Sequence, residues 1–422
     1  MKFELITFLT NPFVPMFLAV VTGLLLGRIK IGKFSFGQSG ALFTGIFIGW
    51  ALYSKYCIPF LLDPTDPKKG VIEGAPKYAA NYFANGVVPS TFFTLTLILF
   101  IAAVGLLAAK DLAKVVRKYG AKFMILGAVI TGTGALMVYL STLIFHGQNH
   151  FAVAGVYTGA LTSSPGLAAA LEATAKFGKE AQAQVGLGHA IGYAPGAFMI
   201  ILVMNLFPII FKIDIEKEKE KFRKEMGTYD NKKEVKEKNI KEVGMDVVSF
   251  FTVCLVGYFV GSINIYLPFV KWMSLGSTGG VLIMSLWLGH IGKIGPLTFR
   301  MNNAVLSAIR DISLSLFLAI VGLEYGYETI NALGGSGATL AMISFGAGLI
   351  AMTVGYLVGR YVFKMNWIIL AGAMCGGATS TPGLGAAIES TKTDEVAAGY
   401  GACYPFALLC KVIFVIILHK VT

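Results

Sequence analysis

Charged side chains are scarce in this chain. Only 14% of its 422 residues are Asp, Glu, Lys or Arg, against about 25% in soluble globular domains. Hydrophobic residues make up 55% of the chain, and the mean hydropathy is +0.71. Apolar stretches of about 20 residues recur along most of its length, and each is long enough to cross a hydrocarbon core about 30 Å thick. The composition therefore excludes a soluble multi-domain protein and indicates a polytopic membrane protein.

Cysteines and enzyme signatures are also few. The five cysteines show no CxxC spacing and lie mostly in apolar runs, so we expect buried thiols, not disulfides or metal ligands. The chain has no HExxH motif, Walker loop, nucleotide fingerprint or acyl-transfer triad, so we expect neither an enzyme nor a bound cofactor. Lys and Arg outnumber Asp and Glu by 35 to 23. This excess concentrates in short loops, as orientation signals do, which predicts a lipid bilayer and not nucleic acid as the partner.

One hydroxyl-rich string occurs twice. It reads TSSPGL from Thr162 and TSTPGL from Thr379, 217 residues later, and nine of the thirteen positions that begin at each threonine are identical. At the same offset, Leu97–Leu106 and Leu314–Leu323 share seven of ten residues. One spacing that links two separate pairs indicates a duplicated unit. In a chain this apolar, a duplicated Pro-Gly break inside a hydrophobic span points to a transporter.

Ten segments are predicted to cross the membrane, and two are predicted to be interrupted. The crossings lie near residues 7–27, 38–62, 88–108, 120–145, 181–211, 245–270, 276–292, 304–323, 337–360 and 396–418. The interrupted segments, 151–175 and 367–391, each carry the Pro-Gly break. If both are re-entrant hairpins, each half has five crossings and the second half is inverted, which places most loop Lys and Arg on one side. Twelve full crossings would leave the most basic stretch outside, which the positive-inside rule disfavours.

The predicted fold is thus an all-α membrane protein with two inverted repeats, each of five transmembrane helices and one re-entrant hairpin. The first repeat is residues 1–211 and the second is 245–422. Residues 212–244 are rich in both Lys and Glu and poor in apolar residues. We interpret them as a charged, solvated and partly helical cytoplasmic linker.

The two breaks are the predicted substrate-binding site. Backbone that leaves a helix inside a membrane must line a cavity or be buried in protein. Pro165 and Pro382 suit the first position of a new helix, and Ser164 and Thr381 suit the cap position before it. With inverted repeats, the two helices that follow bring positive N-terminal ends together, which suits a small anion without a buried cationic side chain. The predicted site residues are Thr162, Ser163, Ser164, Pro165, Gly166, Thr379, Ser380, Thr381, Pro382 and Gly383.

Two carboxylates are candidates for coupling. Glu172 and Glu389 correspond across the repeat and suit proton or cation sites, since intramembrane carboxylates are usually functional. Alternatively, they form surface pairs with Lys176 and Lys392 at the mouth of each hairpin. Coupling to a sodium ion or a proton therefore stays open.

Three further residues follow the hairpins in the sequence. His189, Tyr193 and Tyr404 either line the cavity or form packed contacts between helices, and the pattern does not discriminate between these readings. No metal site is expected from the spacing of the His and Cys residues.

Three runs resemble the aspartate:alanine exchanger family of bacterial antiporters. They are Gly295–Leu323, which includes Arg310-Asp311, Gly23–Ile31 and Thr379–Ala387. The resemblance covers nearly the whole chain outside 212–242. It implies exchange of small carboxylates, such as aspartate for alanine, or export of dicarboxylates such as succinate. It also implies a homodimer in the bacterial plasma (inner) membrane, with an elevator-like transport unit moving against a scaffold.

One departure from the family is visible. Family members commonly carry regulatory domains of the potassium-transport C-terminal type between the halves, whereas only the charged linker occupies that place here. Regulation of that kind is therefore not expected.

The sequence predicts an alternating-access exchanger of small carboxylates or acidic amino acids. A sodium-coupled carboxylate or glutamate symporter is the alternative, because unwound carbonyls near the breaks can bind sodium without an acidic side chain. An ion channel that uses the same hairpins and a membrane receptor that moves no solute also remain open.

Overall fold

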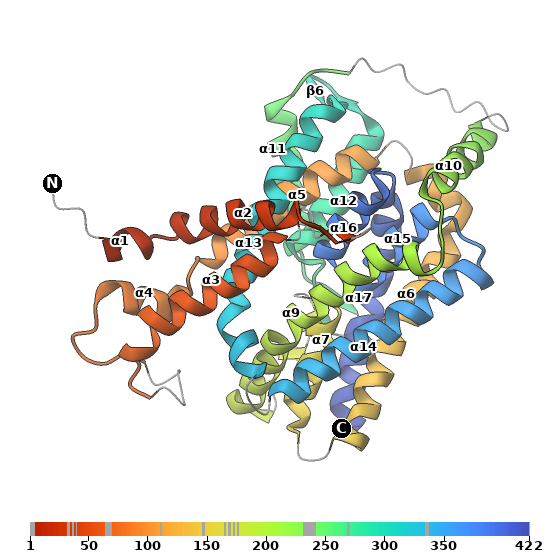
Figure 1. Ribbon diagram of the computed structural model, residues 1–422. Helices are drawn as coiled ribbons and strands as arrows, with labels where there is room; N and C mark the ends of the chain where they lie inside the picture. Colours follow the sequence, from red (N-terminus) through yellow and green to blue (C-terminus); the bar gives the residue numbers. More distant parts are fainter. Residues whose placement is uncertain are drawn as a thin grey trace. The chain divides into compact units, whose positions relative to one another are not determined.

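A computed structural model describes most of the chain. The described residues are 5–31, 34–35, 38, 40–63, 70–109, 112–145, 148–163, 166–167, 170–171, 174, 177–230, 242–267, 271–333 and 337–421. Within them the chain is mainly α-helical (Figure 1), and its strands form three short antiparallel pairs. The pairs are β1 (Lys30–Ile31) with β2 (Phe34–Ser35), β3 (Ile265–Leu267) with β4 (Lys271–Met273), and β5 (Lys293–Ile294) with β6 (Leu297–Thr298).

The helices follow one another with short connections. Those before the central linker are α1 (Leu5–Leu9), α2 (Phe13–Gly27), α3 (Gly40–Tyr56), α4 (Lys77–Asn85), α5 (Ser90–Ala108), α6 (Leu112–Ile144), α7 (His150–Ala160) and α9 (Lys179–Ile210). Those that follow are α10 (Ile215–Asp230), α11 (Val247–Ser262), α12 (Gly276–Ile291), α13 (Asn303–Leu333), α14 (Gly337–Leu357), α15 (Trp367–Ala378), α16 (Thr381–Thr391) and α17 (Val396–Val421). A 3-10 turn (Ile58–Phe60) follows α3, and a π turn (Val358–Val362) follows α14.

Each of the ten predicted crossings contains a helix. Among the described residues, seven helical stretches are long and apolar enough to span a membrane by length and composition. They are Gly40–Phe60, Ser90–Leu107, Lys118–Ile144, Gln184–Ile210, Asn303–Tyr327, Gly337–Val362 and Val396–Val415. The apolar helices α2, α11 and α12 are shorter, with 15, 16 and 16 residues. The number of helices and their composition identify a multi-pass membrane protein.

The two predicted interrupted segments are not single helices. Residues 367–391 divide into α15 and α16, which have 12 and 11 residues. Residues 151–175 begin with α7, which ends at Ala160. Because a span needs about 20 residues, neither α15 nor α16 crosses a membrane by itself.

Packing divides the chain into two compact units, and both halves of the sequence contribute to each. Unit 1 comprises Met1–Leu97 and Ile312–Ala338, and unit 2 comprises Ile98–Asp311 and Thr339–Thr422. In unit 1, α2 packs on α3 without room for side chains, because a Cβ on Gly23 would lie 2.2 Å from the Cα of Ala41.

In unit 2, two pairs of helices cross in the same way. A Cβ on Gly155 of α7 would lie 2.1 Å from the Val185 carbonyl oxygen of α9. A Cβ on Gly372 of α15 would lie 1.8 Å from the Val396 carbonyl oxygen of α17. These glycines are 217 residues apart, so each short helix is held against a long helix at matching positions. Small residues at such crossings let helix backbones approach closely in membrane proteins.

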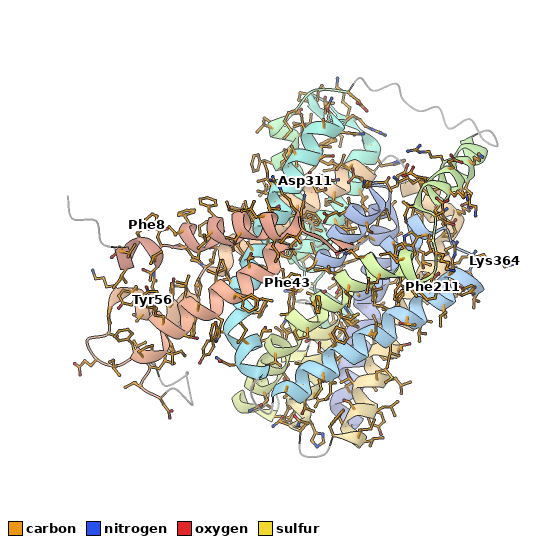
Figure 2. The ribbon with its side chains drawn as sticks, viewed as in Figure 1. Phe8, Phe43, Tyr56, Phe211, Asp311 and Lys364 are labelled. Carbon is orange, nitrogen blue, oxygen red and sulfur yellow. The ribbon has the colours of Figure 1, made fainter. Side chains whose placement is uncertain are left out.

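Large apolar side chains stay exposed on several helices. Phe8 of α1 is 47% exposed (Figure 2). On α11, Leu255 and Phe259 are 71% and 66% exposed. Exposed apolar faces of this kind suit contact with lipid or with another protein better than contact with water.

Helix α10 corrects one expectation about the charged linker. The sequence predicted a solvated stretch, yet Glu218 and Phe222 are buried, with 4% and 1% exposure. The Glu218 carboxylate accepts bonds from the Arg360 guanidinium at 2.9 and 3.0 Å and from the Trp367 backbone N–H at 2.7 Å. One face of α10 therefore packs within unit 2 and holds the first residue of α15. The expectation was wrong for this face because the partners of Glu218 lie more than 140 residues away in the sequence.

Candidate functional site

The two chain breaks have the same local geometry. Thr162 and Thr379 both adopt left-handed backbone, with φ of 47° and 53°. The Ser163 N–H donates to the Thr158 carbonyl, and the Ser380 N–H donates to the Cys375 carbonyl, each at 2.8 Å. This is the Schellman closure of a helix C-terminus. Left-handed backbone is uncommon for a β-branched residue, so its occurrence at both threonines marks a specific local structure.

A serine begins the helix after each break. The Ser380 hydroxyl oxygen accepts from the Gly383 N–H at 3.1 Å, and the Ser163 hydroxyl oxygen accepts from the Gly166 N–H at 3.1 Å. The predicted cap at Thr381 was wrong by one position, because Thr381 is already the first residue of α16. Both positions carry a hydroxyl, so residue type alone could not distinguish them. The predicted residues Ser164 and Pro165 lie outside the described residues.

Both glycines that follow the caps are in close packing. A Cβ on Gly166 would lie 2.9 Å from the Ser163 hydroxyl oxygen and 3.3 Å from the Lys411 Cδ. A Cβ on Gly383 would lie 2.4 Å from the Ile200 Cγ2. The absence of a side chain at each glycine therefore lets α9 and α17 approach the breaks.

The two breaks are in direct contact. The Thr379 hydroxyl donates to the Leu161 carbonyl oxygen at 3.3 Å. Lys411 of α17 is fully buried, and its ammonium donates to the Leu161 carbonyl at 3.2 Å, to the Ala378 carbonyl at 2.9 Å and to the Thr379 hydroxyl at 2.8 Å. We call Leu161–Ser163, Ala378–Ser380 and Lys411 together the break junction. All of it lies within unit 2.

Sequence reasoning missed Lys411 and required no buried cation. The available signal was one lysine inside the long apolar run of α17, and an ionisable residue in such a run is a functional candidate by default. Its partners could not be inferred, because Leu161 lies 250 residues away in the sequence and Ala378 lies 33 away.

The hydroxyls of the two matched threonines differ in their contacts. Thr379 bonds both Lys411 and Leu161. Thr162 is 5% exposed, and its hydroxyl has no hydrogen-bond partner among the described residues. A buried hydroxyl left without a partner costs about 1–3 kcal/mol. Thr162 is thus a polar group at the break junction whose bonding capacity a bound solute can use.

The other predicted residues are placed differently. His189 is 2% exposed and its Nδ1 lies 2.9 Å from the Thr158 hydroxyl oxygen, while its ring packs 5.4 Å from that of Tyr193. Tyr404 is 1% exposed, and its ring centroid lies 5.5 Å from that of Tyr400. These three side chains are packed between helices of unit 2, as one of the two readings expected.

The two repeat-matched carboxylates do not take part in the contacts of the break junction that the structure describes. Glu389 is exposed near the C-terminal end of α16, with Lys392 exposed beyond it. This position agrees with the surface reading of Glu389. Glu172 lies outside the described residues.

Comparison with known proteins defines the class as a membrane permease. Residues 69–209 and 249–420 match the family described as a predicted permease membrane region. The chain belongs to this family, the aspartate-alanine exchangers.

The relatives are named as transporters. An uncharacterized transporter of Desulfotalea psychrophila is 22% identical over 564 aligned positions, which cover 96% of each chain. Since this chain has 422 residues, that relative carries residues that have no counterpart here. An uncharacterized transporter of Bacteroides fragilis is 34% identical over 41% of this chain and 33% of its own length. A putative transport protein of Yersinia enterocolitica is 38% identical over 37% of this chain and 29% of its own.

Proposed function

We propose that this permease exchanges small carboxylates or acidic amino acids by alternating access, with the break junction as its substrate site. The observation that carries the proposal is the buried ammonium of Lys411, which lies where two chain breaks meet. None of the ion pairs found among the described residues involves Lys411. A negatively charged solute would supply the missing countercharge.

The energetics favour an anion over a neutral solute. Burial of an ammonium costs several kcal/mol even after relaxation. The carbonyl ends of α7 and α15 offset part of this cost, since each helix terminus contributes up to about 2 kcal/mol in a partly buried site. On the other side of each break, the capped N-termini at Ser163 and Ser380 add positive potential. The balance at the break junction is therefore positive, and a carboxylate would stabilise it.

The hydrogen-bonding groups suit a small carboxylate. The Thr162 hydroxyl is a donor without a partner among the described residues, and the two serines lie directly beside it and beside Thr379. A carboxylate accepts several such bonds at once. These donors do not discriminate among aspartate, glutamate, succinate and malate, so the site supports a class of substrates and not one compound.

We further propose that the halves are inverted repeats in an elevator-like homodimer of the bacterial plasma membrane. Two stretches, one in each half, match the same family, as expected for a duplicated unit. The break junction lies wholly within unit 2, which would make unit 2 the mobile transport unit. The homodimer and the membrane are what the family resemblance implies.

Counterflow in proteoliposomes tests the proposal. Vesicles loaded with unlabelled aspartate, alanine, glutamate, succinate or malate would be offered the same labelled compounds outside. An exchanger takes up label only against an internal countersubstrate and needs no sodium gradient. Uptake that requires sodium would identify the symporter, and flux without trans-stimulation would identify a channel. Binding without any flux would leave only a receptor.

A further inference from the structure

Lys411 contacts matching atoms of the two breaks. Leu161 and Ala378 are 217 residues apart, the same offset as the repeated string, and each follows or closes a short helix at the equivalent carbonyl. The Lys411 ammonium bonds both of these carbonyl oxygens, at 3.2 and 2.9 Å. One cation thus joins the C-terminal ends of α7 and α15.

The ammonium is used completely by these contacts. An ammonium has three N–H donors and a neutral amine has two. Lys411 has three acceptors, the two carbonyls and the Thr379 hydroxyl, within 3.2 Å. The geometry therefore matches the charged form of lysine and leaves no N–H for a direct bond to substrate in this conformation.

The three acceptors form an oxygen-only set. Carbonyls at the C-terminal ends of broken helices are the groups with which transporters of this architecture bind a dissolved coupling cation. Here the same kind of set surrounds a covalently attached cation. The negative ends of α7 and α15 face it, which favours a positive charge at this point.

The matched position in the other half carries no charge. Ile200 of α9 lies against Gly383 as Lys411 of α17 lies against Gly166. The break junction therefore contains one such cation for both breaks, and the asymmetry lies in a single side chain.

We propose that the Lys411 ammonium is a tethered substitute for a dissolved monovalent cation, positioning both breaks so that the carrier needs no sodium ion there. This inference deepens the proposed function and rests on it for the flux measurement. The stability measurement below does not depend on transport. Lys411 is on this account a positioning residue, because it acts on substrate through the two breaks.

The first test measures thermal unfolding of purified protein in sodium, potassium, ammonium or ethylammonium chloride, each against choline chloride at equal ionic strength. Lys411→Ala opens the oxygen set to a dissolved cation. Its unfolding temperature should rise by about 2 °C or more when a small cation is present at ten times its dissociation constant, and the wild type should not respond. Ile200→Ala is the matched control, because it removes similar volume at the corresponding position and should not respond either.

Two results would overturn the inference. One is a sodium-specific rise in the unfolding temperature of the wild type, and the other is a Lys411→Ala variant that responds to none of the four cations. If Lys411→Ala does not fold, Lys411→Gln serves instead, because its amide can still donate to two of the acceptors. Lys411→Gln should fold and should lose exchange at least about tenfold, since the charge is absent; unchanged exchange would overturn the inference.

The flux measurement separates the two proposals. Wild-type exchange should be equal in sodium and in choline medium, and ethylammonium should restore part of the exchange lost in Lys411→Ala. Carboxylate exchange that requires sodium would overturn the role of Lys411 and leave the carboxylate site standing. Absence of any carboxylate flux would overturn the proposed function, while the stability result would still decide the role of Lys411.

Discussion

At the scale of single residues, the break junction is nearly symmetric in backbone and asymmetric in its side chains. Thr162 and Thr379 share a left-handed backbone, and Ser163 and Ser380 share a capping bond. The difference lies in the hydroxyls, because Thr379 is held by Lys411 and Thr162 has no partner among the described residues. The repeat therefore builds a common frame, and one lysine differentiates the two sides.

This asymmetry predicts that Thr162 contributes more directly to substrate binding than Thr379. Thr162→Val removes a donor and keeps the branched shape, so the affinity for the exchanged carboxylate should fall about 10- to 100-fold, the value of a hydrogen bond to a charged group. The measurement is equilibrium binding of labelled substrate to purified protein.

Thr252→Val is the matched control for Thr162→Val. The Thr252 hydroxyl bonds the Val248 carbonyl within α11, outside the break junction, and its loss should leave the affinity unchanged. Equal affinities in Thr162→Val and wild type would remove this hydroxyl from the proposed site.

The same residues show the reach of sequence analysis. Repetition located both breaks and named Thr162, Ser163, Thr379 and Ser380, because local backbone closure depends on residues that are neighbours in the chain. Lys411 escaped because its role is created by contacts across 33 and 250 residues.

At the scale of elements, α10 fixes the start of the second hairpin. Glu218 bonds the Trp367 N–H at the first turn of α15 and the Arg360 guanidinium before it. One helical face further on, Glu225 bonds Lys118 and the Tyr119 hydroxyl of α6. Charge composition predicted the helix but not its docking, because alternating Lys and Glu are also typical of a solvated surface.

The docking of α10 should depend on pH in a defined direction. Burial raises the pKa of Glu218, but the bonds from Arg360 and from the Trp367 N–H together outweigh it, and the pKa falls below its usual 4.5. A carboxyl with a lowered folded-state pKa contributes its full stability above pH 4.5 and loses it as the pH falls through the folded-state value. The unfolding temperature of the wild type should therefore decline below pH 4.5.

Glu218→Gln tests the origin of that decline. The substitution removes the charge facing Arg360 and should cost about 2 kcal/mol at neutral pH, with a weaker acid dependence than the wild type. Glu216→Gln is the control, because the Glu216 side chain on the same helix is 80% exposed. If Glu218→Gln and wild type lost stability in parallel below pH 4.5, this carboxylate would not be the group responsible.

The crossing of α15 with α17 predicts a second element-scale effect. In Gly372→Val, the new Cβ would lie 1.8 Å from the Val396 carbonyl oxygen, so the helices must separate. We expect a loss of about 3 kcal/mol or more in unfolding free energy and a matching loss of substrate binding, because α15 leads into the break junction. Gly346→Ala has open space around its Cβ and should be neutral or slightly stabilising; similar behaviour of both variants would contradict the packing account.

At the scale of the whole molecule, the packing units do not follow the order of the sequence. Unit 1 takes α13 from the second half, and unit 2 takes most helices of both halves. Hydropathy located the ten crossings because apolar length is a local property. The grouping of helices into units depends on crossings between distant glycines, such as Gly45 with Ala319, and periodicity carries no record of these pairs.

The inverted arrangement makes a prediction about sidedness. If both interrupted segments are hairpins, the central linker is cytoplasmic and the end of α13 is external; if both are full crossings, the two positions are reversed. A membrane-impermeant maleimide should label Asn331→Cys in intact cells of a bacterial host and Arg223→Cys only after permeabilisation. Both side chains are exposed in the wild type. Labelling in the opposite order would reject the inverted model.

The most direct test of the central claim is a density map of the protein with the carboxylate identified by counterflow. The account predicts anion density at the break junction, within about 3.2 Å of the Thr162 hydroxyl, with Leu161 and Ala378 still joined through Lys411. Anion density elsewhere in the protein, or continuous helix through either break, would contradict it.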